Sequence, residues 1–247
     1  MQQKKVYISF FGTMTIKNEY GIITEQDINS NQMKKLIAYL VLNRKSLISA
    51  DILTAILWPQ GNDDPYTALR GLVFRLRKLL KPVFPDDDFI VAKNGSYIIN
   101  PIFDLVVDAE QLYVISKYKI STTGAKAFLD NSCYPFIESL ANDIWGLPVC
   151  TYYNSRLITY ICTVIRKMIE DDNYDDAVKY ATKGLVIDHM SEKLHLLIIE
   201  ALAKKGCRQL AVKHYENTIT MFQNEYGITP TKQFLSSKYR IFNSEEV

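Results

Sequence analysis

A chain of 247 residues with 48% hydrophobic and 23% charged residues is long enough for one or two globular domains and too apolar for a disordered tail. No apolar run reaches the roughly 18–20 residues of a membrane span, and the N-terminus lacks the apolar segment of a signal peptide. The four cysteines form no C-x-x-C pair and match no zinc spacing. We therefore expect a cytoplasmic protein with reduced thiols, no metal and no cofactor.

The net charge of +2 is unevenly distributed. Residues 1–101 carry 13 Lys and Arg against 9 Asp and Glu, whereas residues 102–247 carry 16 against 18. The first part is therefore the one in which a nucleic-acid surface is to be sought.

Strand signals at the start of the chain are followed by three helical patterns. β-Branched and aromatic residues at 6–16, with a turn at 18–21, predict a strand pair. Apolar residues at helical spacing predict a helix at 32–42 and a second one that Ser49 caps and Trp58-Pro59 ends. A third helix is predicted at 65–81, with Asp64 as its cap and Pro65 at its first position.

The third helix has an apolar face and a basic face. Its apolar face holds Leu69, Leu72, Val73, Leu76, Leu79 and Leu80. The opposite arc holds Thr67, Arg70, Gly71, Phe74, Arg77, Lys78 and Lys81, with Arg75 on its flank. Solvated helices usually mix charges of both signs, so an arc without acidic residues favours a polyanionic partner. A solvated charged surface is the alternative.

Two β-rich segments around Asn94-Gly95 predict a hairpin at 89–100. Helix, helix, basic helix and hairpin is the order of a winged helix, in which the third helix enters the major groove and the hairpin reaches the backbone or the minor groove. Lys93, near the tip, is a candidate phosphate contact or an ordinary turn residue.

These strings resemble the OmpR-type winged helix-turn-helix, in the version found in SARP-type regulators. The resemblance rests on Leu57-Trp58-Pro59 and on the residues at 68–80 and 94–99. It implies a leading antiparallel sheet, a recognition helix at 65–81 and a C-terminal wing. It places DNA contacts on Thr67, Arg70, Phe74, Arg75, Arg77, Lys78 and Lys93. Phe74 departs from the family, which has a small or polar residue there; it could touch a thymine methyl group or pack on a loop.

Residues 101–108 are predicted to bridge the two parts. Beyond them the second part, assigned to 102–247, is predicted to be helical, beginning with a helix at 108–118 that Asp108 caps. The string Ala177-Val178-Lys179 recurs at Ala211-Val212-Lys213, 34 residues later, which is the period of tetratricopeptide repeats. The repeat predicts two helix pairs, 155–170 with 174–187 and 191–205 with 207–223. A closing helix is predicted at 231–242.

This part resembles the bacterial transcriptional activator domain that follows the winged helix in SARP-type proteins. The residues that carry the likeness are those at 192–203, Gly206, Ala211, Tyr215 and the closing string at 225–230. His189-Met190 stands where the family has a proline, which should alter a turn but not the fold.

The chain shows no phosphate-binding loop and no nucleophile motif, so we expect no enzyme activity. Asp86-Asp87-Asp88 favours a solvated turn over a metal site. The predicted fold is multidomain: an α+β winged helix at 1–101 and an all-α repeat domain at 102–247.

The predicted function is a sequence-specific transcription regulator that binds double-stranded DNA, and the resemblance makes it an activator. The helical domain would contact RNA polymerase or self-associate on direct-repeat sites, without a membrane partner. Two alternatives remain: an interaction scaffold without DNA binding, and a truncated sensor-regulator whose missing C-terminal part binds a ligand. An interaction scaffold has no need of Arg70, Arg77 and Lys78 together on one arc. Their presence therefore favours the DNA-binding regulator.

Overall fold

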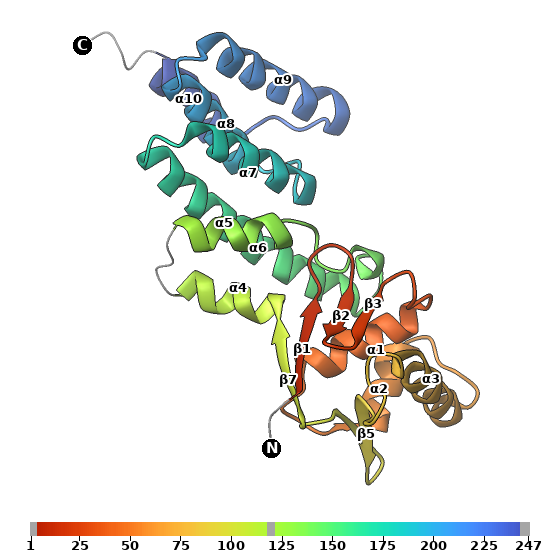
Figure 1. Cartoon of the computed structure of the whole chain (residues 1–247). Coiled ribbons are helices and arrows are strands. Elements are labelled where there is room, and N and C mark those ends of the chain that lie inside the picture. The colour runs from red at the N-terminus through yellow and green to blue at the C-terminus, as the bar shows by residue number, and fades with distance from the viewer. Residues whose placement is uncertain (1–3, 118–121, 243–247) are drawn as a thin grey trace. The chain divides into compact units, whose positions relative to one another are not determined.

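The fold is described from a computed structural model that covers residues 4–117 and 122–242 (Figure 1). These residues fall into two compact units. Unit 1 comprises the chain up to residue 113 together with residues 136–153, and unit 2 comprises residues 114–135 together with the chain from residue 154. Helices α4 (Asp108–Lys117) and α6 (Gly146–Glu170) contribute residues to both units.

Unit 1 begins with a sheet that buries one face. Ile8 pairs with Ile16, and Ile16 with Ile23, and all three side chains are buried. The strands that carry them pair antiparallel, as predicted: β1 (Lys4–Ser9), β2 (Thr15–Asn18) and β3 (Gly21–Thr24).

A fourth strand, β7 (Phe103–Val107), completes the sheet in the order β3-β2-β1-β7 and runs parallel to β1. The leading antiparallel sheet is confirmed for β1, β2 and β3, whereas the strand at 103–107 was not predicted, because residues 101–108 were expected only to bridge the two parts. Phe103, Leu105 and Val107 are buried while Asp104 is exposed, which is the period-two pattern of a strand. Because β7 belongs to this sheet, unit 1 extends past the predicted division at 101/102.

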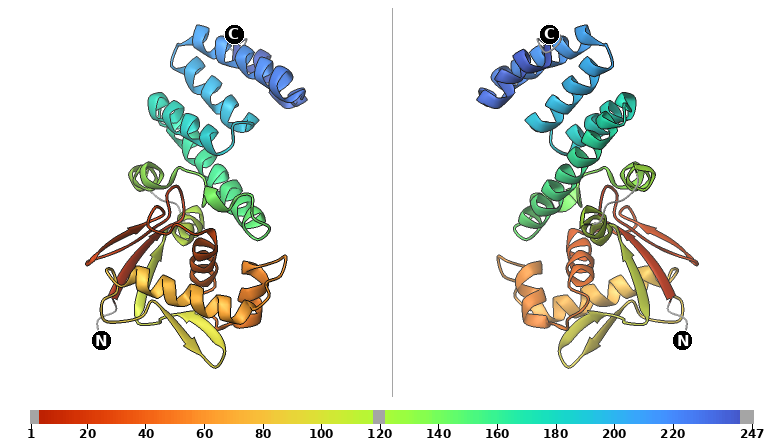
Figure 2. Two further views of the ribbon diagram at one scale, coloured as in Figure 1. Left: turned by 90° about the vertical axis from the view of Figure 1, so that its right-hand side faces the viewer. Right: turned by 90° about the vertical axis from the view of Figure 1, so that its left-hand side faces the viewer.

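Three helices and a second small sheet follow in unit 1. Ser30 and Ser49 cap the first two helices by accepting hydrogen bonds from the backbone N–H groups of Met33 and Ile52. The helices are α1 (Asn31–Leu42), α2 (Ala50–Leu57) and α3 (Pro65–Leu80), in agreement with the sequence patterns. The small sheet has the order β4-β6-β5 and contains β4 (Ile48–Ser49), β5 (Ile90–Lys93) and β6 (Ser96–Ile99). Figure 2 shows the helices on one side of the four-stranded sheet and the β5–β6 hairpin projecting beside α3.

Residues 136–153 return to unit 1 from much later in the sequence. Phe136 packs edge-on against Phe10 and Phe11 and stacks on Tyr153, at 4.3 Å between ring centroids. The backbone N–H of Ile137 donates to the carbonyl of Phe10. This segment contains the short 3-10 helix η1 (Glu138–Leu140). Its aromatic packing explains why the compact units do not follow the order of the chain.

Unit 2 is a stack of helices with the expected repeat. Its helices are the last residues of α4, α5 (Thr122–Ser132), the larger part of α6, α7 (Tyr174–Ile187), α8 (Glu192–Lys204), α9 (Arg208–Tyr226) and α10 (Lys232–Phe242). Helix α9 begins 34 residues after α7, and α8 ends 34 residues after α6. The repeated alanines Ala177 and Ala211 are both fully buried, which lets the paired helices approach closely. Among the described residues, no helix is long and apolar enough to cross a membrane.

Helix α6 begins at Gly146, earlier than the predicted start at 155. The carboxylate of Asp143 accepts hydrogen bonds from the N–H groups of Trp145 and Gly146, which caps the helix. Pro148 lies in the first turn, where its missing N–H leaves no intrahelical bond unmade. The proline therefore does not delay the start of the helix.

A histidine pair is packed inside the repeat of unit 2. The Nδ1 atom of His195 lies 3.0 Å from Nε2 of His214, and the Nε2 atom of His195 lies 3.0 Å from the carbonyl oxygen of His189. Burial, and then the neighbouring His195, lower the pKa of His214 to about 4. Burial also lowers the pKa of His195. Both rings are therefore neutral in the folded protein at pH 7.

Acidification is expected to destabilise unit 2. Between pH 6.5 and 4 the unfolded chain takes up protons that folded His214 does not, so the free energy of unfolding falls as the pH falls through this window. The loss is at most about 3 kcal/mol. Urea unfolding followed by far-UV circular dichroism at pH 7 and pH 4.5 measures it. His214→Gln should show a smaller pH dependence than the wild type; an equal dependence in both would contradict the assignment.

Candidate nucleic-acid interface

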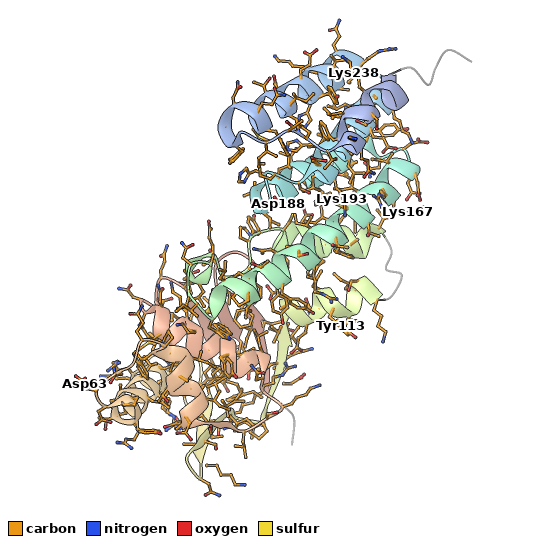
Figure 3. All side chains as sticks on the ribbon, turned by 180° about the vertical axis from the view of Figure 1, so that it is seen from behind. Asp63, Tyr113, Lys167, Asp188, Lys193 and Lys238 are labelled. Carbon is orange, nitrogen blue, oxygen red and sulfur yellow. The ribbon has the colours of Figure 1, made fainter. Side chains whose placement is uncertain are left out.

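Helix α3 is held in place by its apolar face and capped at its start. Leu69, Leu72, Leu76 and Leu80 are buried, as the pattern predicts, whereas Leu79 is only half-buried. The carboxylate of Asp64 accepts a hydrogen bond from the N–H of Thr67. The preceding loop is exposed, and Asp63 on this loop is labelled in Figure 3. The cap and the buried leucines fix the rotation of α3, and this determines which residues face the solvent.

The outward face of α3 is positively charged. Arg70, Arg75 and Lys78 are exposed, and Phe74 among them has 69% of its surface exposed. The guanidinium of Arg70 donates to Oγ1 of Thr67 at 2.8 Å. We call Thr67, Arg70, Phe74, Arg75 and Lys78 the exposed face of α3. Five of the seven predicted contact residues therefore lie on one surface.

Arg77 is placed differently from the prediction. It is half-buried, and its Nε donates to the carbonyl oxygen of Ile90 in β5 at 2.9 Å. The carboxylate of Asp88 lies 3.5 Å from the same Nε atom. The side chain of Arg77 thus ties α3 to the hairpin and does not extend from the outward face.

Arg77→Ala is expected to destabilise unit 1 by about 1–2 kcal/mol, because the buried carbonyl of Ile90 loses its charged donor. Lys78→Ala, one residue along the helix and exposed, should change the free energy of unfolding by less than about 0.5 kcal/mol. Denaturant unfolding followed by tryptophan fluorescence compares the two, since Trp58 and Trp145 both lie in unit 1. Equal stabilities would show that the Arg77 contact has no structural role.

The β5–β6 hairpin forms the predicted wing. Asn94 and Gly95 have φ angles of 48° and 72°, which the tight turn requires. The carbonyl of Gly95 accepts a hydrogen bond from the N–H of Ala50, at the first residue of α2. Ile48 in β4 pairs with Tyr97 in β6. Lys93 is exposed at the end of β5. The wing is therefore anchored to the helix-turn-helix.

The acidic run at 86–88 is engaged in ion pairs, which the prediction of a solvated turn did not include. Asp87 and Asp86 lie 2.9 and 3.6 Å from Nζ of Lys4, and Asp88 pairs with Arg77 and Lys81. Among the described residues, no group of three potential ligands could hold a metal ion. The run balances the cations at the far end of α3 and leaves the exposed face of α3 positive.

A buried carboxylate supports the scaffold of unit 1. Asp108 accepts hydrogen bonds from the N–H groups of Phe10, Phe11 and Ala109 at 2.7–3.0 Å. Burial raises its pKa to about 6, although these hydrogen bonds oppose the rise. The sequence predicted Asp108 only as a helix cap. Its main role is to bind the backbone that follows β1.

A buried cation supports the helices. Lys35 of α1 is 4% exposed; its ammonium pairs with Asp143 and donates to the carbonyl oxygen of Ile56 in α2 at 3.3 Å. This ion pair holds the pKa of Asp143 below its ordinary value, against the effect of burial. No local pattern pointed to a role for Lys35, because its partner Asp143 lies more than a hundred residues away in the sequence.

Two comparisons with known proteins found similarity to this chain, one to a protein family and one to a solved structure. Residues 135–241 match the family described as the bacterial transcriptional activator domain. The chain is also similar in fold to Mycobacterium tuberculosis EmbR, whose structure was solved in complex with a low-affinity phosphopeptide. The TM-score is 0.72 at 15% sequence identity, over 99% of this chain and 66% of that one. No curated protein sequence matches the chain.

The segment that matches the activator domain does not coincide with one compact unit. Residues 136–153 lie in unit 1, and most of the remainder forms the helix pairs of unit 2. A winged helix followed by the segment that matches the activator domain is the order that the sequence resemblance implied, and the fold is similar to that of EmbR over 99% of this chain.

Proposed function

We propose that this chain regulates transcription by binding double-stranded DNA in a sequence-specific manner. Helix α3 enters the major groove, and the β5–β6 wing contacts the backbone or the minor groove. The observation that carries the proposal is the exposed face of α3. Within residues 65–80 no acidic residue occurs, and three cations and an exposed phenylalanine project from one side.

The individual roles follow from chemistry and placement. Arg75 and Lys78 suit phosphate oxygens, because both are exposed cations on the outward face of the helix. Arg70 and Thr67, already hydrogen-bonded to each other, suit a base edge near the start of α3. Phe74 offers an apolar surface to a thymine methyl group. Arg77 acts as a positioning residue for the wing.

Lys93 gives the wing a cation at its tip. It is exposed, and the hairpin that carries it is fixed to α2 by the backbone bond between Ala50 and Gly95. A lysine on an anchored hairpin suits a phosphate next to the groove that α3 occupies.

The activator-domain match supports activation as the direction of regulation. We propose that the helical repeat of unit 2 contacts RNA polymerase or a second copy of the chain bound to a direct-repeat site. In vitro transcription with the purified chain tests the direction. Sedimentation on DNA with one or two half-sites tests self-association.

Fluorescence anisotropy tests DNA binding itself. The purified protein is titrated onto labelled DNA from upstream of its own gene, at several salt concentrations, beside a scrambled duplex of the same composition. We expect saturable binding that prefers the upstream DNA and weakens steeply with salt. Failure of the folded protein to bind either duplex at low salt would refute the proposal and favour an interaction scaffold.

A further inference from the structure

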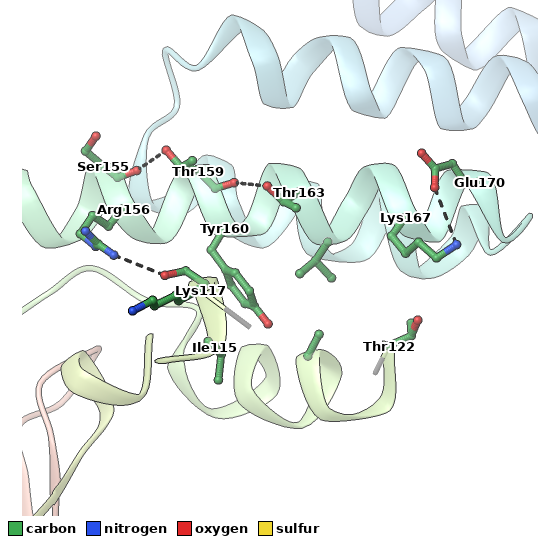
Figure 4. A pocket seen from close by; sticks show the side chains of 13 residues that line it. Ile115, Lys117, Thr122, Ser155, Arg156, Thr159, Tyr160, Thr163, Lys167 and Glu170 are labelled. Atoms are coloured by element: carbon green, nitrogen blue, oxygen red, sulfur yellow. Dashed lines mark hydrogen bonds and ion pairs between the residues drawn. The ribbon is translucent and has the colours of Figure 1, made fainter. Parts of the chain in front are cut away.

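A cavity of about 900 Å³ lies within unit 2, between the end of α4, the start of α5 and the middle of α6 (Figure 4). Such a volume is in the range of sites that hold small organic ligands. The DNA-binding proposal uses none of its lining residues. From α4 and α5 the lining comprises Ile115, Ser116, Lys117, Thr122 and Ala125.

Tyr160 of α6 gives the cavity an unsatisfied polar group. Its side chain is 7% exposed, and among the described residues its hydroxyl has no hydrogen-bond partner. The ring packs edge-on against Phe128, which turns the phenol toward α5, as Figure 4 shows for the labelled side chain. A buried hydroxyl without a partner is costly, and a ligand that hydrogen-bonds to it removes this cost.

The walls of the cavity are apolar and its α4 end is positive. Ile115, Ala125 and Val164 supply the apolar surface. Arg156 donates to the hydroxyl of Ser116 at 3.3 Å, beside Lys117. The acidic residue in the described lining is Glu170, at the other end of this stretch of α6, where it pairs with Lys167.

We propose that this cavity binds an amphipathic organic acid. The carboxylate lies at the Arg156 and Lys117 end, the apolar body lies along the walls, and a hydroxyl or carbonyl group meets the Tyr160 hydroxyl. Arg156 and Tyr160 are four residues apart on α6, about 6 Å along the helix axis, so one small molecule reaches both.

The test uses the full chain and the fluorescent anion 8-anilinonaphthalene-1-sulfonate as reporter. Saturable one-to-one binding is expected, with displacement by ω-hydroxycarboxylates and no displacement by alkyltrimethylammonium ions of equal length. The displacement constants across increasing chain lengths report which ligand spans the two polar anchors. Thr163→Trp, which places a large ring at the exposed rim, should abolish reporter binding.

Two variants separate the polar contacts. Arg156→Gln should weaken carboxylate binding at least tenfold, whereas Arg166→Gln, on the same helix and outside the lining, should leave it unchanged. Tyr160→Phe should keep binding of the plain carboxylate and lose the preference for the ω-hydroxy compound. Its melting temperature should be unchanged or higher, because the unpartnered hydroxyl is gone.

Three results would overturn the proposal. They are the absence of saturable binding, equal displacement by the ammonium and carboxylate series, and binding that Arg156→Gln and Thr163→Trp leave unchanged. If Arg156→Gln unfolds, Lys117→Gln serves in its place, and unchanged affinity in that variant is equally contradictory. None of these readouts involves DNA, so their failure is distinguishable from failure of the proposed function.

Discussion

Replacing Arg75 and Lys78 together by alanine will weaken binding to upstream DNA by about 100-fold, through the loss of two exposed cations on α3. If both contact phosphates, the slope of log affinity against log salt will fall in magnitude by about 2. The fold should be unaffected, since neither side chain forms an ion pair within the described residues. Anisotropy titrations at four or more salt concentrations measure both quantities.

Lys17→Ala is the matched control for this prediction. It removes one positive charge from an exposed position on β2, outside α3 and the wing, and should change the affinity less than about threefold. Similar losses in Lys17→Ala and in the double variant would mean that net charge, not the exposed face of α3, drives binding.

Asp108→Ala should reduce the free energy of unfolding of unit 1 by about 3–5 kcal/mol, one of the largest effects of any single substitution in this chain. The change leaves the N–H groups of Phe10, Phe11 and Ala109 without their acceptor in a buried place. A loss of this size corresponds to a fall in melting temperature of roughly 10–20 °C. Tryptophan fluorescence reports it, because both tryptophans lie in unit 1.

Asp104→Ala controls for removal of a carboxylate from the same stretch of chain. Asp104 is exposed on β7, and its loss should cost less than about 0.5 kcal/mol. If the two variants have the same stability, the Asp108 carboxylate is not the link between the start of α4 and the backbone after β1.

Local patterns in the sequence were enough to predict much of unit 1. Capping residues and apolar spacing predicted α1, α2 and α3 to within a few residues, and Asn94-Gly95 predicted the wing. The exposed face of α3 followed from the same periodicity, since a helix of known register has a known outward side. The 34-residue recurrence likewise predicted the helix pairs of unit 2.

Pairings between distant residues were not predictable in this way. The alternation in Phe103–Val107 was a usable strand signal, but nothing local says that its partner is β1, about a hundred residues earlier. The packing of Phe136 on Phe10 and the Lys35–Asp143 ion pair were missed for the same reason, because each joins residues far apart in the sequence. Arg77 shows the limit within a correctly predicted helix. The helical periodicity placed its side chain on the outward arc, yet the side chain donates a hydrogen bond to the carbonyl oxygen of Ile90. Angular position on a helix does not determine which neighbour a long side chain reaches.

The most direct test of DNA contact by α3 is site-specific photocrosslinking. p-Benzoylphenylalanine is placed at Phe74 in one protein and at Ile144 in another; both positions lie in unit 1 and are 69% and 68% exposed. With labelled upstream DNA, we predict a strong, salt-sensitive crosslink from position 74 and none above background from position 144. A crosslink from position 144 alone, or equal crosslinks from both, would contradict the assignment of α3 as the recognition helix.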